Sequence, residues 1–284
     1  MKKRKGTTFL LLIMMLLGIG ILSYPTVSDY YNSFHQSRAI ANYNEALQRV
    51  SDTDYTHEWQ AAVDYNQELR SCDHRFHPDT EMLKRYQQLL DPTGTGIMGY
   101  IEIPKLHVIL PIYHGTDDSV LQVAIGHIAG TSLPIGGKGT HSVLSGHRGL
   151  PSAKLFTDLD QMEIGDTFSL RVLDEVLSYE IDQILIVLPY ETEALEIVQG
   201  EDYCTLTTCT PYGINTHRML VRGHRMENLI PAGTIKIVSE AMQIDSAIVA
   251  SFIAIPCILL FFAIIVIGAS RRNEYGGGID GTIH

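Results

Sequence analysis

The sequence predicts a mainly β protein: an eight-stranded β-barrel with an N-terminal helical region and two transmembrane helices. Three observations support this fold class. Short apolar runs separated by Gly, Pro and Asp fill residues 96–240, polar helical periodicity fills the region before them, and two long apolar segments enclose both. About eight strands in roughly 140 residues favour one closed barrel over two domains.

The first apolar segment predicts a membrane anchor over residues 7–27, after a basic tail at residues 1–6. Its most apolar part, residues 9–22, is short for a bilayer, which needs about 20 residues, so a cleaved signal peptide is the competing interpretation. The missing small-residue cleavage site favours the uncleaved anchor. The second segment, residues 247–269, has no charge and is long enough to span, with Pro256 as a kink.

Basic residues next to apolar spans predict the orientation of the chain. Lys2 to Lys5 precede the first span, and Arg271 and Arg272 follow the second. Lys and Arg beside a span tend to remain cytoplasmic. Residues 1–6 and 270–284 are therefore expected to be cytoplasmic tails, with the segment between the spans outside the cell.

The net charge and the cysteine content limit the classes of function that the chain can have. The net charge of −11 argues against nucleic-acid binding, which needs a basic surface to displace counterions. Of the four cysteines, Cys257 lies in the second span, which leaves Cys72, Cys204 and Cys209 outside the cell. An odd count predicts at least one free thiol, unless one pairs between chains. We expect Cys204 to pack inside the barrel.

Residues 28–95 are expected to form two or three helices above the membrane. Apolar residues recur near a period of 3.6 in residues 55–69 and again in residues 82–90. Asp79, just after a proline, is a reasonable start for the later helix. The charged stretch at residues 71–79 is expected to be a loop between them.

Turn chemistry at residues 91–96 marks the start of the barrel domain, residues 96–240. The expected strands cover residues 98–103, 107–113, 141–145, 167–172, 176–187, 203–208, 218–223 and 234–238. Two helical inserts are expected, at residues 119–123 and 153–159.

Three side chains stand at predicted strand ends and supply complementary chemistry. Cys209 ends one strand, and Arg218 opens the next strand after a short turn. A cation beside a thiol favours the reactive thiolate and can hold a developing oxyanion. His147 follows another strand end and supplies a group that can protonate a leaving amine.

Spacing alone leaves other assignments open. A histidine after a strand is often a turn residue with a satisfied hydrogen bond, and Arg218 fits a surface charge equally well. The competitors for the same roles are His217, His224 and Arg222.

Several blocks of sequence resemble one family. Thr-Leu-Thr-Thr-Cys at residues 205–209 resembles the TLxTC signature of sortases, and Ser-Gly-His-Arg-Gly at residues 145–149 resembles the segment with the catalytic histidine of that family. Residues 99–104, 110–116 and 215–223 resemble the class C, pilus-assembling branch. The chain therefore resembles the class C sortases, which are cysteine transpeptidases.

The resemblance implies an eight-stranded sortase barrel with Cys209, His147 and Arg218 in the three catalytic positions. It also implies a reaction: the cysteine cleaves an LPXTG-like sorting signal of a secreted protein, and a thioester forms. A pilin lysine, or a peptidoglycan-precursor amine in wall attachment, then takes the acyl group. The resemblance implies neither a metal nor an organic cofactor.

One departure concerns a lid. Pilus sortases often carry an Asp-Pro-aromatic triplet over the active site, which residues 71–79 lack. Our hypothesis is that Asp73 pairs with Arg218 and that Phe76 covers Cys209. An ordinary polar loop between two helices is the alternative.

Two other functions compete with pilus polymerisation. A sortase of the same chemistry attaches proteins to the wall or mainly hydrolyses them. A membrane-tethered redox or binding protein would use the three extracellular cysteines, but the sequence has no C-x-x-C pair. The spacing of Cys204 and Cys209 also places them on opposite faces of one strand.

Overall fold

The structure is a computed structural model that describes residues 2–49, 55–227 and 254–260. The chain divides into two units, with residues 1–30 in one and the barrel in the other, and each is described by itself. Helix α1 (Lys2–Arg49) runs through the predicted anchor. Within the described ranges one helix is long and apolar enough to cross a membrane, inside Leu10–Gln48, with a mean hydropathy of 2.2. Of the second predicted span, only residues 254–260 are described, and they are helical.

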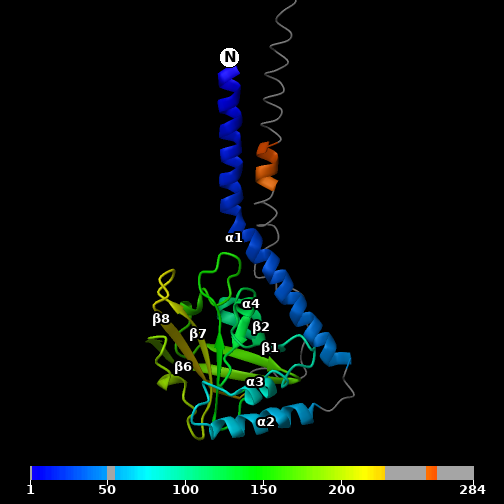
Figure 1. The fold of residues 1–284 in the computed structure, drawn as a ribbon, viewed down its shortest axis with the longest axis vertical. Coiled ribbons are helices and arrows are strands. Elements are labelled where there is room, and N and C mark those ends of the chain that lie inside the picture. The colour runs from blue at the N-terminus through cyan, green and yellow to red at the C-terminus, as the bar shows by residue number, and fades with distance from the viewer. Residues whose placement is uncertain (1, 50–54, 228–253, 261–284) are drawn as a thin grey trace, which may run out of the picture. The chain divides into compact units, whose positions relative to one another are not determined.

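Eight strands form a closed barrel, as the sequence predicts (Figure 1). The strands are β1 (Ile97–Ile103), β2 (Val108–His114), β3 (Ile125–His127), β4 (Thr140–Ser145), β5 (Thr167–Val172), β6 (Glu175–Val187), β7 (Asp202–Thr210) and β8 (His217–Arg225). Their order around the barrel is β1-β2-β3-β4-β7-β8-β6-β5. The β2–β3 and β4–β7 pairs are parallel, and the others are antiparallel.

The barrel differs from the sequence prediction at one strand and one helix, and one predicted strand lies outside the described residues. Strand β3 was not predicted, because its three residues are too few to show a period. The strand expected at residues 234–238 lies outside the described residues. The helix predicted at residues 153–159 is wrong: turns lead there into a 3-10 helix, η2 (Leu159–Gln161). Leu155 and Phe156 are buried in the core, and Leu155 has a φ of +38°, so tertiary packing sets this backbone.

The predicted helices outside this segment are present. Helices α2 (Thr56–Arg70) and α3 (Thr80–Tyr86) lie against the barrel, and α4 (Asp118–Leu121) matches the other predicted insert (Figure 1). Asp79 caps α3 by accepting a hydrogen bond from the Met82 amide at 2.8 Å. Short 3-10 helices follow β1, as η1 (Pro104–Leu106), and precede β7, as η3 (Glu193–Leu195).

From Tyr31 onward, α1 is tied to the barrel by side chains that bind backbone groups. Asn32 Nδ2 donates to the Ser152 carbonyl at 2.6 Å, and Gln36 Nε2 donates to the Val123 carbonyl at 2.6 Å. The fully buried Tyr43 hydroxyl donates to the Met98 carbonyl at 3.0 Å and accepts from the Leu173 amide at 2.8 Å. This part of α1 is therefore an integral part of the barrel unit.

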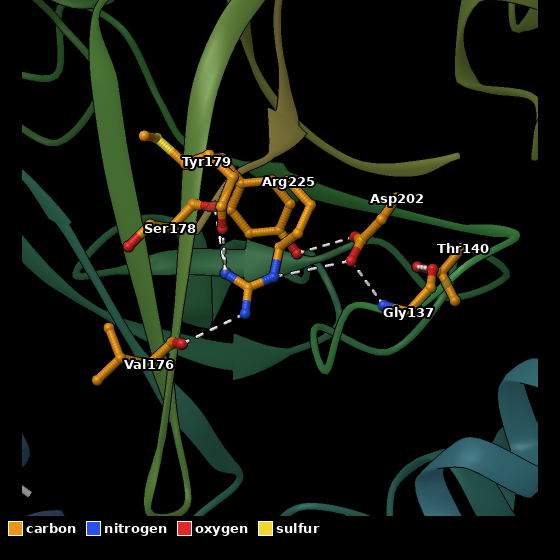
Figure 2. Close-up of polar contacts among 8 residues, drawn as sticks. Gly137, Thr140, Val176, Ser178, Tyr179, Asp202 and Arg225 are labelled. Atoms are coloured by element: carbon orange, nitrogen blue, oxygen red, sulfur yellow. Dashed lines mark hydrogen bonds and ion pairs between the residues drawn. The ribbon is translucent and has the colours of Figure 1, made fainter. Parts of the chain in front are cut away.

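Figure 2 shows a polar network at the start of β7, the opposite end of the strand from Cys209. Asp202 accepts from the Gly137 amide at 2.7 Å and from the Tyr179 hydroxyl at 3.2 Å. Arg225 lies 3.8 Å from the Asp202 carboxylate and donates to the Ser178 carbonyl at 3.2 Å. Burial raises the pKa of the Asp202 carboxyl. The network joins β6, β7 and β8 to the glycine-rich loop before β4.

Candidate active site

The β7–β8 hairpin places a thiol and a guanidinium side by side. Cys209 and Arg218 are direct cross-strand partners, with Thr208 opposite Met219 as the next pair. Residues directly opposite in an antiparallel pair point to the same side of the sheet, about 5 Å apart. The pairing therefore places the Cys209 and Arg218 side chains on the same side of the sheet.

The parallel β4–β7 pair places His147 at the same edge of the barrel. Ser145 of β4 pairs with Thr207 of β7. Two residues further along each strand direction lie His147 and Cys209. Gly146 continues the pairing beyond the ladder, because its amide donates to the Thr207 carbonyl at 3.1 Å and its carbonyl accepts from Thr208 Oγ1 at 2.7 Å. The parallel register therefore brings the backbone of residue 147 to the level of residue 209 on the neighbouring strand.

Side chains along β7 alternate between the barrel core and the outer face, which shows the face on which Cys209 lies. Cys204 and Leu206 are fully buried in the barrel core, whereas Cys209 is half-buried. Odd-numbered residues of β7 consequently point away from the barrel core, where Thr205 and Thr207 are covered by other segments and Cys209 remains half-exposed. The His147 imidazole makes no hydrogen bond to another described residue. Arg218 Nη1 donates to the carbonyls of Asn215 and His217, at 3.3 and 3.1 Å, which leaves its other nitrogens unbound in the described residues.

The competing residues are placed elsewhere. Arg222 forms a bidentate ion pair with Asp182, at 3.0 and 2.8 Å, and stacks over the Tyr203 ring. His224 is paired with Tyr203, near the far end of the strand from Cys209. His217 lies beside Thr210, but its Nδ1 is within 2.9 Å of the Thr216 hydroxyl in the exposed turn. Geometry therefore favours His147 and Arg218.

Comparison with known proteins agrees with this arrangement. A family model described as the sortase domain matches residues 101–226. Sortase D of Bacillus subtilis is 30% identical over 150 residues, which are 52% of this chain and 72% of that protein. The chain belongs to the sortase family. Sortases are cysteine transpeptidases, so this sortase is an enzyme of that kind.

Solved structures place the sortase among class C neighbours. Sortase C1 of Streptococcus agalactiae is 48% identical, with a TM-score of 0.66 over 67% of this chain and 99% of that one. Sortase C-1 of Actinomyces oris is 45% identical, with a TM-score of 0.57 over 62% of this chain and 100% of that one.

The predicted lid loop lies on the same outer surface as Cys209. Phe76 packs against an apolar cluster that contains Val143 of β4, Leu195 of η3 and Leu220 of β8. Leu220 is paired with Thr207, two residues before Cys209. Asp73 is exposed. Phe76 thus packs on the outer face of β4 and β8, and neither Phe76 with Cys209 nor Asp73 with Arg218 forms a contact among those described.

Sequence reasoning missed the buried cation that holds this loop. Arg75 is 6% exposed and donates to the carbonyls of Gly130 at 3.3 Å and Leu195 at 3.0 Å. It also forms an ion pair with Glu196 at 2.9 Å and lies over the Phe76 ring. No sequence pattern indicated these partners, because two of the three are backbone carbonyls far away in the chain.

His141 was also missed. It is fully buried on β4, where Nδ1 donates to the Glu196 carbonyl at 2.9 Å and Nε2 accepts from the Thr205 hydroxyl at 2.7 Å. Burial, with the nearby cations of Arg222 and Arg75, lowers the pKa of this imidazole to about 4. A neutral His141 thus ties the segment before β7 to the outer surface of the β4–β7 pair.

The remaining thiols differ from Cys209 in their surroundings. Cys204 is fully buried, as predicted, and burial raises the pKa of its thiol well above the usual range. Cys72 is exposed on the loop after α2, and all four cysteines are free thiols. In the described part of the chain, no three His, Cys, Asp or Glu side chains gather as a metal site requires.

Proposed function

We propose that this sortase cleaves an LPXTG-like sorting signal through a thioester on Cys209 and joins the acyl group to a pilin lysine, which polymerises a pilus. The observation that carries the proposal is the meeting of three strands at one accessible edge. Cys209 and Arg218 are paired across β7 and β8, and His147 and Cys209 each lie two residues beyond the last β4–β7 pair.

The first half of the proposed reaction is acylation. Cys209 Sγ, as thiolate, attacks the carbonyl carbon of the Thr–Gly amide, and the carbonyl oxygen becomes an oxyanion that Arg218 stabilises. The tetrahedral intermediate collapses when protonated His147 gives its proton to the departing glycine nitrogen. The C–N bond breaks, a thioester remains, and His147 is neutral.

The second half reverses these roles. A lysine amine attacks the thioester carbonyl, and neutral His147 takes the proton that the amine loses. Cys209 leaves as a thiolate, which restores the initial ion pair. Water in place of the amine gives hydrolysis, so exclusion of water decides between polymer and hydrolysed product.

Similarity supports a pilin as the substrate. Sortase C of Streptococcus pneumoniae, whose structure has been analysed for pilin substrate specificity, is 40% identical with a TM-score of 0.58. That likeness covers 68% of this chain and 99% of that one. Secreted proteins with LPXTG-like signals and a pilin lysine are thus the proposed partners.

The proposed location is the cell membrane, with the barrel outside the cell. We place spans at residues 7–27 and 247–269 and both tails, residues 1–6 and 270–284, in the cytoplasm. Residues 28–95 form the extracellular helical region and residues 96–240 the catalytic domain. The apolar helix within Leu10–Gln48 supports the first span.

We further propose that residues 71–79 act as a lid. Phe76 packs on an apolar cluster that includes Leu220, the partner of Thr207, two residues before Cys209, which supports the proposed covering role. For Asp73 to pair with Arg218, the guanidinium must turn from the carbonyls of Asn215 and His217, which it binds at 3.3 and 3.1 Å. Asp73→Ala combined with Phe76→Ala is expected to speed thiol labelling of Cys209. Unchanged labelling would remove the lid from the proposal.

The test of the proposed function uses the full chain in detergent micelles with an LPXTG peptide and a lysine-bearing pilin. Cys209→Ala is expected to abolish cleavage, whereas Cys72→Ala and Cys204→Ser retain it. Mass spectrometry should find the acyl group on Cys209, and high-mass covalent ladders should appear with the pilin. Cleavage by Cys209→Ala would overturn the thioester, and activity loss in all three variants would favour redox chemistry. Peptide cleavage without ladders would refute polymerisation alone.

A further inference from the structure

The segment after β4 carries His147, but the ladder that positions it has already ended. The last β4–β7 pair is Ser145 with Thr207, so regular pairing stops before both His147 and Cys209. Turns connect this point to η2. The two Gly146 bonds to β7 hold the backbone just before His147, and contacts made by the residues after it add to them.

Arg148 makes such a contact. Its Nη1 donates to Thr210 Oγ1 at 3.3 Å, and its Nη2 forms a short ion pair with Asp160 of η2. Thr210 directly follows Cys209, and Arg148 directly follows His147. One guanidinium thus connects the neighbour of the thiol residue, the neighbour of the imidazole residue and η2.

The burial of Arg148 is not explained by stability. Its side chain is only 10% exposed, and its Nε is buried with no hydrogen-bond partner among the described residues. An orphaned N–H on a buried cation costs stability, and apolar residues of similar size often serve as well in such places. The buried guanidinium is therefore weak evidence for a stabilising role.

We propose that Arg148 is a positioning residue that holds His147 at the distance from Cys209 that proton transfer to the leaving amine requires. The proposal rests on the proposed roles of His147 and Cys209. Arg148 itself does not touch the substrate. A displacement of about 1 Å between reacting groups can cost about 100-fold in rate, so one such clamp has a measurable effect.

The main variant is Arg148→Met, which keeps much of the volume and removes both contacts. Cleavage of an LPXTG peptide by the full chain is expected to lose about 10- to 100-fold in kcat, while KM changes less than about twofold. The midpoint of thermal unfolding is expected not to fall. Arg148→Lys should recover part of kcat, because one ammonium group reaches Asp160 or Thr210 but not both.

Two further variants sharpen the test. Thr210→Val removes only the acceptor hydroxyl next to Cys209, so it should lower kcat in the same direction even if Arg148→Met folds poorly. Lys154→Met is the matched control, because Lys154 is a cation of the same segment that pairs with Asp158 at 2.6 Å. The control is expected to keep wild-type kcat and KM.

Unchanged kcat in both Arg148→Met and Thr210→Val would overturn the proposal. So would an equal loss in Lys154→Met, or a fall in unfolding midpoint that parallels the loss of kcat, because both indicate a purely structural role. The Cys209→Ala variant separates the two proposals. If it is inactive while Arg148→Met is fully active, the positioning role fails and the proposed function stands.

Discussion

Two buried histidines predict that the barrel loses stability well above the pH at which carboxylates titrate. His127 is fully buried on β3, where Nε2 lies 2.8 Å from the Ser132 carbonyl and Nδ1 lies 3.0 Å from the Tyr86 hydroxyl. Burial lowers the pKa of His127 to about 4, and the pKa of His141 likewise falls to about 4. Both imidazoles are therefore neutral in the folded chain at pH 5.

The sign follows from proton binding. The unfolded chain takes up a proton on each histidine below its ordinary pKa of 6.5, while the folded chain does so only near 4. Stability is complete above pH 6.5 and is lost as the pH falls toward 4. Between pH 7 and pH 5 each histidine accounts for about 2 kcal/mol, or about 4 kcal/mol together. Asp202 acts in the opposite direction, because its pKa is raised in the folded chain.

Urea unfolding of the full chain in detergent micelles measures this effect. Trp59 is the only tryptophan and packs against the barrel core, so its fluorescence reports barrel unfolding. His127→Gln and His141→Gln should each remove about half of the loss between pH 7 and pH 5. His74→Gln, in the exposed loop, is the matched control and should remove none. The reasoning is refuted if the double variant keeps the full pH-dependent loss.

Three further predictions concern the loop at residues 71–79, the Gly130 backbone that packs against it, and helix α3. Arg75→Met should lower the free energy of unfolding by about 2–4 kcal/mol, because two buried carbonyls lose their donor, and should make the loop sensitive to limited proteolysis. Unaltered proteolysis of this variant would contradict the role of Arg75 as an anchor. Gly130→Ala should cost at least about 2 kcal/mol in urea unfolding, because φ is +86° and a Cβ would lie 2.0 Å from the Arg75 carbonyl oxygen; a neutral effect would show that the loop can shift. Asp79→Ala should cost about 1 kcal/mol through the lost α3 cap, whereas Asp73→Ala, which is exposed, should cost nothing measurable by the same assay.

The sequence predicted the strands that carry the candidate site residues better than the long-range contacts around them. Cys209 and Arg218 lie near the ends of β7 and β8 that meet in one hairpin, and His147 follows β4, so their place at strand ends could be predicted from the sequence pattern. Arg75 and His141 were missed because long-range contacts define them. Arg75 binds the carbonyl of Leu195, 120 residues away, and such a pairing leaves no local signal.

Long-range contacts also explain why β3 was not predicted and why the helix predicted at residues 153–159 is wrong. Long strands show alternation, but the three residues of β3 form a strand only because β2 and β4 flank them. The segment at residues 153–159 has helical spacing, yet Phe156 fills the barrel core and its amide binds the His147 carbonyl at 3.2 Å. Tertiary contacts override local preference in both cases.

The parallel β4–β7 pair has a consequence for the order in which the chain becomes active. Cys209 and Arg218 belong to one hairpin, which closes locally and quickly, whereas Gly146 and Thr208 meet across 62 residues. Closure of that long connection costs more entropy and is slower. We therefore expect the Cys209–Arg218 pair to form before His147 reaches the same edge, so that the proposed site is completed by the β4–β7 contact.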